Sequence, residues 1–227
     1  MSPKVTSIQL TADVFAKGPH AGSFAFLCGT TKCDMFYVRY LAKDNKMVAE
    51  LEQTNHNEPI VDIAFPQGYG ALFATASGDN IRVWHATEYR ELLRIQVCDS
   101  QPTQPTTQGR CLASQPGRLA ASAEPGSGGW VVVWQYPNLK VNCIFFMADG
   151  KSLVTGWSDG KIRAFGPQSG RLLYTIPNAH QLGVTAIIGS NDCTKLISGG
   201  REGQVREWCP PARSPTAMWV GLGFTTT

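Results

Sequence analysis

The sequence predicts an all-β fold, an incomplete β-propeller with about four repeated blade units. Alternating apolar strands recur at a fixed spacing, and tight turns join them in pairs. The 23 Gly and 14 Pro among 227 residues also favour many turns over long helices. A repeat of about 43 residues, as found here, lies in the range of propeller blades of four strands each.

Three segments share one pattern, in which a short apolar strand leads into a hairpin that closes on an aromatic residue. They run over Val61–Trp84, Val141–Phe165 and Val184–Trp208, intervals of 23, 24 and 24 residues. A weaker copy runs over Val5–Tyr40, and its Tyr40 lies 44 residues before Trp84, while Phe165 lies 43 residues before Trp208. Further strands at 91–97 and 171–176 are expected to form the outer strand of a blade. This agreement in spacing indicates one repeated structural unit.

Tight turns are predicted inside each hairpin, at Gly78-Asp79-Asn80, Ser158-Asp159-Gly160 and Arg201-Glu202-Gly203. Glycine suits such turns because it accepts a positive φ without steric cost. The acidic residues Asp79, Asp159 and Glu202 stand at equivalent places in successive units. That equivalence favours a turn-forming role over a role as catalytic carboxylates.

Two stretches depart from the repeat. Residues 98–137 are rich in Pro, Gln, Ser, Thr, Ala and Gly and are expected to form a low-complexity insertion or loop between blades. Within it, 130–134 (WVVVW) either adds a strand or forms an exposed apolar patch. The tail at 209–227 contains two successive prolines, which would end a strand. The predicted organisation is therefore two units at 1–97, the insertion at 98–137, two units at 138–208 and a non-repeat tail at 209–227.

Composition excludes several classes of protein. A net charge of +3 is too small and too dispersed for a nucleic-acid binder. Seven cysteines, an odd number without a CxxC pair, indicate free thiols in a reducing compartment, and the four histidines do not lie at zinc-ligand spacing beside them. No signal peptide is visible, and the longest apolar run is too short to span a bilayer. We therefore expect an intracellular protein with no metal, cofactor, nucleic-acid or membrane partner.

Motifs for catalysis are also missing from the sequence. It contains no phosphate-binding loop, nucleophile elbow, HExxH or dinucleotide fingerprint. We therefore expect no enzymatic activity and no small-molecule substrate. Function should then lie on surfaces, where Arg82, Arg163 and Arg206 stand at matching places before each closing aromatic. These arginines either form a stripe that contacts an acidic partner or simply pack their stems along the strand.

The units resemble WD repeats, although the closing pairs are Trp84-His85, Phe165-Gly166 and Trp208-Cys209 instead of Trp-Asp. In that family a His before the first strand, a Ser or Thr in the second, an Asp in the turn and the Trp form a buried hydrogen-bonded set. The resemblance implies three structural sets in this chain: His56, Asp79 and Trp84; Thr155, Asp159 and Phe165; His180, Ser198, Glu202 and Trp208. The middle set lacks the His and the Trp, which predicts weaker internal bracing.

Longer strings, at 62–95, 146–187 and 196–208, resemble the cilia- and flagella-associated WD-repeat proteins of the axoneme. The resemblance covers about 5–97 and 138–208. It implies a structural role in cilia and flagella as a microtubule inner protein, with tubulin and other inner proteins of the doublet microtubule as partners. A generic cytosolic WD-repeat adaptor is the alternative, and an enzyme built on a propeller is a third. Because four units do not close a propeller of the usual seven blades, we expect a partial propeller that is poorly stable alone.

Overall fold

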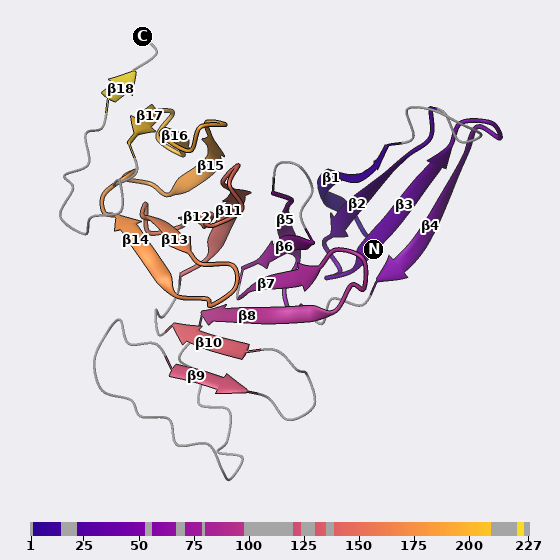
Figure 1. Ribbon diagram of the computed structural model, residues 1–227. Helices are drawn as coiled ribbons and strands as arrows, with labels where there is room; N and C mark the ends of the chain where they lie inside the picture. The colour runs from indigo at the N-terminus through magenta and orange to yellow at the C-terminus, as the bar shows by residue number, and fades with distance from the viewer. Residues whose placement is uncertain are drawn as a thin grey trace.

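The computed structural model describes residues 2–14, 22–52, 56–66, 71–78, 80–97, 120–123, 130–134, 139–209 and 222–224. The regular elements in this part of the chain are all β-strands, so the all-β prediction is confirmed. The strands form four sheets that follow one another along the chain (Figure 1). We call these sheets the first to fourth units, and their innermost strands lie beside one another in chain order. The fold is a partial β-propeller.

Each unit is built on an antiparallel meander of four strands in chain order. The strands of the first unit are β1 (Val5–Val14), β2 (Phe24–Thr30), β3 (Met35–Leu41) and β4 (Lys46–Glu52). Those of the second are β5 (Ile60–Ala64), β6 (Leu72–Ser77), β7 (Asn80–His85) and β8 (Glu91–Val97). The third contains β11 (Val141–Phe146), β12 (Leu153–Trp157), β13 (Ile162–Phe165) and β14 (Leu172–Ile176). The fourth contains β15 (Val184–Gly189), β16 (Leu196–Gly200), β17 (Val205–Trp208) and β18 (Leu222–Phe224).

The insertion and the tail both contribute strands. Within the insertion, β10 (Trp130–Trp134) runs parallel to β8, and β9 (Ala120–Ala123) pairs with β10, so the second sheet has six strands. Of the two alternatives for 130–134, the structure shows the strand. The tail, expected to stand outside the repeat, supplies β18 as the outer strand of the fourth unit. An exposed strand edge has backbone N–H and C=O groups to pair, a requirement that does not depend on the repeat sequence.

The cross-strand register shows that three units are equivalent residue by residue. The first residue of each inner strand faces the end of the second strand: Ile60 faces Ser77, Val141 faces Trp157 and Val184 faces Gly200. A register shift follows this first pair in all three units. Ile60, and not Val61, therefore begins the second unit, and the closing aromatic then follows after 24 residues in every one of the three.

The first unit closes on a different residue from the one predicted. Val38 faces Phe26 across β2 and β3, and Trp208 faces Leu196 at the same position of the fourth unit. Tyr40 lies two residues beyond Val38, so the prediction that Tyr40 is the closing residue is wrong. Side chains alternate along a strand, so both residues lie on one face and the error leaves the apolar pattern intact. Val38 lies 46 residues before Trp84, against 43 between Phe165 and Trp208, and the three additional residues lie between Val38 and Ile60.

The core consists of apolar layers between neighbouring units. Leu27 and Met35 of the first unit pack with Ile60, Phe73 and Trp84 of the second. Similar layers lie between the second and third units and between the third and fourth. Each unit therefore buries one face of its sheet only because a neighbour covers it, as expected for a repeat architecture. Within the described residues no helix is long and apolar enough to cross a bilayer.

Candidate functional site: buried polar networks of the blade units

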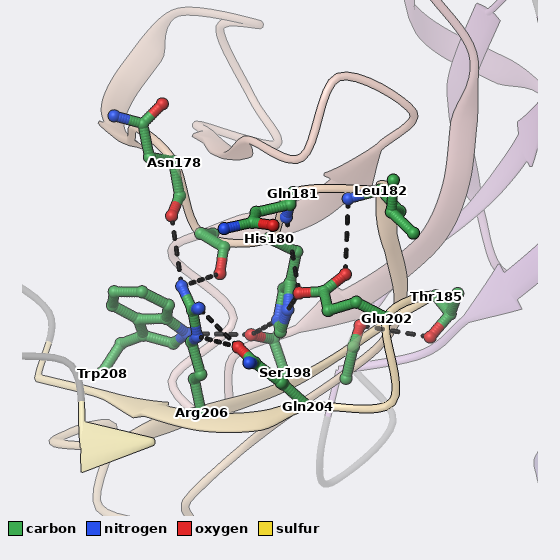
Figure 2. A network of polar contacts seen from close by, with 12 residues as sticks. Asn178, His180, Gln181, Leu182, Thr185, Ser198, Glu202, Gln204, Arg206 and Trp208 are labelled. Atoms are coloured by element: carbon green, nitrogen blue, oxygen red, sulfur yellow. Dashed lines mark hydrogen bonds and ion pairs between the residues drawn. The ribbon is translucent and has the colours of Figure 1, made fainter. Parts of the chain in front are cut away.

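The fourth unit contains a chain of four hydrogen-bonded side chains (Figure 2). The indole N–H of Trp208 on β17 donates to Ser198 Oγ on β16 over 2.8 Å. The same Oγ lies 2.8 Å from Nε2 of His180, which precedes β15. On the other side of the ring, Nδ1 of His180 lies 2.7 Å from Oε1 of Glu202 in the turn after β16. The network thus joins two strands, a turn and the loop that enters the unit.

The charge on Glu202 fixes the direction of these hydrogen bonds. Desolvation opposes ionisation, but hydrogen bonds from its own backbone N–H, His180 and the Leu182 N–H outweigh it and lower the pKa of Glu202 to about 2. The ionised carboxylate accepts a proton from Nδ1–H of His180. In a neutral imidazole, Nε2 then accepts the hydroxyl proton of Ser198, whose oxygen accepts the indole N–H of Trp208. Every donor in the chain has an acceptor.

The order Ser198, His180, Glu202 is also the order of an acyl-transfer triad, so its accessibility decides what it can do. Ser198 is 1% exposed and His180 is 2% exposed. The Ser198 oxygen is moreover occupied by the indole N–H of Trp208. A buried hydroxyl with both neighbours in place has no route to a substrate carbonyl. The arrangement can brace the unit but is not suited to nucleophilic chemistry.

The second unit repeats the network with a different acceptor. The Nε2 atom of His56 lies 2.7 Å from Thr75 Oγ1, which accepts the indole N–H of Trp84 over 2.8 Å. On the other side of the ring, Nδ1 of His56 lies 2.9 Å from Ser77 Oγ. Ser77 in turn donates to the carbonyl oxygen of Asn80 over 3.1 Å. Asp79, the acidic residue predicted for this set, lies outside the described residues.

The third unit has neither the His nor the closing Trp, and Trp157 supplies the indole N–H donor in its place. Trp157 stands on β12 at the place of Ser77 and Gly200, and its indole N–H donates to Thr155 Oγ1 over 2.6 Å. Thr155 donates to the carbonyl oxygen of Arg163 over 2.8 Å. Phe165, the predicted member of this set, is fully buried in the apolar layer toward the second unit. It closes the unit by packing in this apolar layer.

Asp159 and Arg163 complete the third unit. The guanidinium of Arg163 donates to Oδ1 and Oδ2 of Asp159 over 3.1 and 2.8 Å, and its Cζ lies 4.6 Å from the centre of the Trp157 ring. Desolvation opposes the ionisation of Asp159, but Arg163 and the Lys161 N–H lower its pKa below the ordinary value. The guanidinium over the indole face adds a cation–π contact.

Trp157 is not among the site residues that the sequence predicts, although the sequence contains a signal for it. Counting back four residues from the first residue of the inner strand gives His56 and His180 in two units, and Pro137 in the third. A tryptophan two residues after the hydroxyl position of the repeat, in the unit that lacks the His, therefore indicates a replacement donor. In the first unit the hydroxyl position is taken by Cys28, which is buried, and burial raises the pKa of its thiol.

The three arginines do not form a surface stripe, and this corrects the partner-contact prediction. Arg82 and Arg163 are 1% and 2% exposed. Arg82 forms an ion pair with Glu91 and donates to Asn80 Oδ1, while Arg163 binds Asp159. Arg206 is half-buried and donates to the carbonyl oxygen of Ala179 over 2.8 Å. A buried guanidinium whose N–H groups are already paired offers no surface to a partner.

Polar side chains also link one unit to the next. Asp62 on β5 accepts from the Ile144 N–H of the third unit over 2.9 Å and from the Ser7 hydroxyl of the first over 3.4 Å. Its burial raises the pKa of the carboxyl, although the hydrogen bonds oppose this effect. Asp62 therefore joins three units through one side chain. In the part of the chain that the structure describes, no three His, Cys, Asp or Glu side chains gather where they could hold a metal ion.

Comparison with protein families gives a match to the third and fourth units. The model of the WD domain, G-beta repeat, matches residues 136–165 and 170–209. These ranges contain Trp157, the Arg163–Asp159 pair and the whole His180 network. The family model thus covers the two units whose register and polar networks are described most completely.

Curated relatives match over most of the chain. Cilia- and flagella-associated protein 52 of Sus scrofa and that of Homo sapiens are each 36% identical over 204 residues, which is 90% of this chain and 26% of the relative. The protein of the same name from Chlamydomonas reinhardtii is 40% identical over 183 residues, 81% of this chain and 22% of the relative. The chain spans about a quarter of the length of these relatives.

Proposed function

We propose that the chain, whose third and fourth units match the WD domain, G-beta repeat model and which is similar to cilia- and flagella-associated protein 52, is a structural component of the axoneme of cilia and flagella. In this role it stabilises doublet microtubules from within, as a microtubule inner protein. Its partners are tubulin and other inner proteins, bound through loops and sheet surfaces. Its sites of action are the cytoskeleton and the cilium or flagellum.

The similarity to proteins named for cilia and flagella is the observation that carries the proposal. It extends over 81 to 90% of the chain in a green alga and in mammals. A blade pattern alone would support any WD-repeat scaffold, because many unrelated functions use the same fold. The specific similarity therefore favours the axonemal scaffold over a generic cytosolic adaptor.

The buried networks support a structural role over an enzymatic one. The side chains that could take part in catalysis are hydrogen-bonded to one another inside the units: His180 with Ser198, and Arg163 with Asp159. Their geometry holds turns and strands in place and leaves the surface to binding. A scaffold needs this rigidity, since loops on a rigid framework can present fixed contacts to a partner.

Extraction of axonemes tests the proposal. The tagged full chain is expressed in ciliated cells, and axonemes are treated first with detergent and then with high salt. Retention on the doublet microtubules after both steps is expected, because an inner protein is enclosed by the microtubule wall. Release by detergent alone, or a diffuse cytosolic signal, would support the adaptor instead. Gly203→Ala, which should keep the fold, and Gly160→Ala, which should weaken it, are the matched folding controls.

A further inference from the structure

The outer strand of the second unit, β8, carries a further strand on its edge (Figure 1). β10 runs parallel to β8 at five consecutive positions, from Trp130 opposite Leu93 to Trp134 opposite Val97. β9 pairs with the other side of β10. A parallel pair needs a long connection between its strands, and residues 98–129 supply it. The second unit therefore binds an extended apolar segment that is not one of its own four strands.

The cross-strand register identifies the same stretch of edge in the first and third units. In the second unit, Leu93 faces Val83, the residue before the closing aromatic. Tyr174 of β14 and Glu50 of β4 face the residues at that same position of their own units. The part of β8 that pairs with β10 therefore corresponds to 174–178 in the third unit and to the stretch that begins at Glu50 in the first.

These two other edges have local protection against a further strand. In the third unit, Pro177 takes the place of Gln96 and has no N–H to donate, and Asn178 after it has a φ of 53°, which turns the chain out of the strand. In the first unit, Glu50 and Glu52 place charges on the edge, which disfavours pairing. In the described part of the chain, β4 and β14 are the last strands of their sheets.

β8 has neither form of protection over the segment that pairs with β10. Leu93–Val97 contains no proline and one charged residue, Arg94. The guanidinium of Arg94 donates to Glu91 over 3.0 Å, so this charge is already paired within the strand. Leu93 and Ile95 are buried in the apolar layer toward the third unit, which holds the strand in place. A fixed, extended edge of this kind has backbone N–H and C=O groups that pair with another strand.

We propose that the outer edge of β8 is a docking site for an extended segment of a partner protein, rich in β-branched and aromatic residues, and that β10 occupies this site as an internal competitor. The strand seated on the edge indicates the chemistry of the ligand, because β10 has the sequence WVVVW, with high strand propensity and no charge. A partner segment would pair parallel to β8, as β10 does. Backbone hydrogen bonds supply affinity in such docking, and alternate side chains supply specificity.

The connection of β10 to the third unit makes it an effective competitor. Residues 135–140 lead from β10 directly into β11, so β10 stays near the edge of β8 at an effective concentration of about 1 mM. A partner segment binds only when β10 has left, and its apparent affinity falls in proportion. The proposal goes beyond the axonemal function proposed above and does not rest on it.

Fluorescence anisotropy of a labelled peptide with the sequence of residues 128–136, GGWVVVWQY, measures docking to the full chain. Val131→Pro combined with Val132→Pro removes two successive N–H groups, which point to opposite neighbouring strands, and so releases β10. The peptide should bind this variant at least about 10-fold more tightly than the natural chain, because the tethered competitor is gone. Val131→Thr combined with Val132→Thr is the matched control. It keeps both N–H groups and the β-branched side chains and should bind the peptide as weakly as the natural chain.

Photocrosslinking locates the bound peptide. A diazirine at the peptide position of Val132 should label β8 around Ile95, the residue opposite Val132 in the register of β10. The natural chain should be labelled at the same place at higher peptide concentration, which keeps the test valid even if the proline variant does not fold. Equal affinity for the proline variant and the natural chain, absence of binding to both, or labelling on β4 or β14 instead of β8 overturns the proposal.

Discussion

The indole N–H of Trp157 donates to the hydroxyl oxygen of Thr155 over 2.6 Å, in the unit whose closing aromatic is Phe165. In the second and fourth units the equivalent hydroxyl accepts this bond from the closing tryptophan on the next strand. The hydrogen bond has been kept while its donor has moved from the third strand of the unit to the second. The hydroxyl at the centre of the blade is therefore the fixed part of the network.

Trp157→Phe removes that donor but keeps most of the ring. We expect a loss of about 1–2 kcal/mol in the free energy of unfolding, since a buried hydroxyl loses one partner and the site loses part of its packing. Trp157→Ala should cost about 3–5 kcal/mol because it also leaves a cavity. Urea denaturation monitored by circular dichroism measures both. Equal stability of Trp157→Phe and the natural chain would show that the hydrogen bond contributes nothing.

Gly160 and Gly203 both have a positive φ, 75° and 82°, but their surroundings differ. A Cβ on Gly160 would lie 1.7 Å from the carbonyl oxygen of His180, whereas a Cβ on Gly203 meets nothing within 4 Å. Gly203→Ala should therefore cost only the backbone strain, about 1–2 kcal/mol. Gly160→Ala should cost at least about 2 kcal/mol more, because the loop holding His180 must move. Thermal melts of the pair decide this, and equal melting temperatures would contradict it.

Glu202 gives the fold a specific dependence on pH. Its pKa is about 2, below the ordinary value of 4.5, so its stabilising effect is complete above pH 4.5 and is lost as the pH falls toward 2. Glu202→Gln has no charge to lose there. We therefore expect the urea midpoint of the natural chain to fall more steeply than that of the variant between pH 5 and about 2.5. Parallel curves for the two proteins would rule out this contribution.

Asp62 connects three units, so a change of its carboxylate should loosen them together. Asn at this position keeps one acceptor oxygen but turns an NH₂ group toward the N–H of either Ile63 or Ile144, both of which now donate to the carboxylate. Asp62→Asn should cost about 1–3 kcal/mol through one unsatisfied buried N–H. Hydrogen exchange should quicken at Ile144. Asp149→Asn, in an exposed turn of the third unit, is the control and should leave exchange at Ile144 unchanged.

Much of the candidate site was readable from single positions. The resemblance to WD repeats, whose motif assigns each member a position relative to the strands, implied the following residues: His56, Thr155, Asp159, His180, Ser198, Glu202 and the closing tryptophans. Trp157 was not among the predicted residues, since its role depends on the absence of a histidine four residues before the inner strand, where the sequence has Pro137. The burial of Arg82 and Arg163 was also misjudged. An arginine in an alternating strand can lie on either face, and buried partners, among them Glu91 and Asp159, hold these two inside.

Spacing and alternation predict the repeat, most strands of the last three units and the residues that close those units, because both are local properties of a strand. Contacts between segments set the register of the first unit, where Val38 replaces Tyr40, and add the strands of the insertion and the tail. Tertiary contacts also decide which polar groups meet. A hydrogen bond between a strand and a loop needs donor and acceptor within about 3 Å of each other, and no local sequence pattern records that distance.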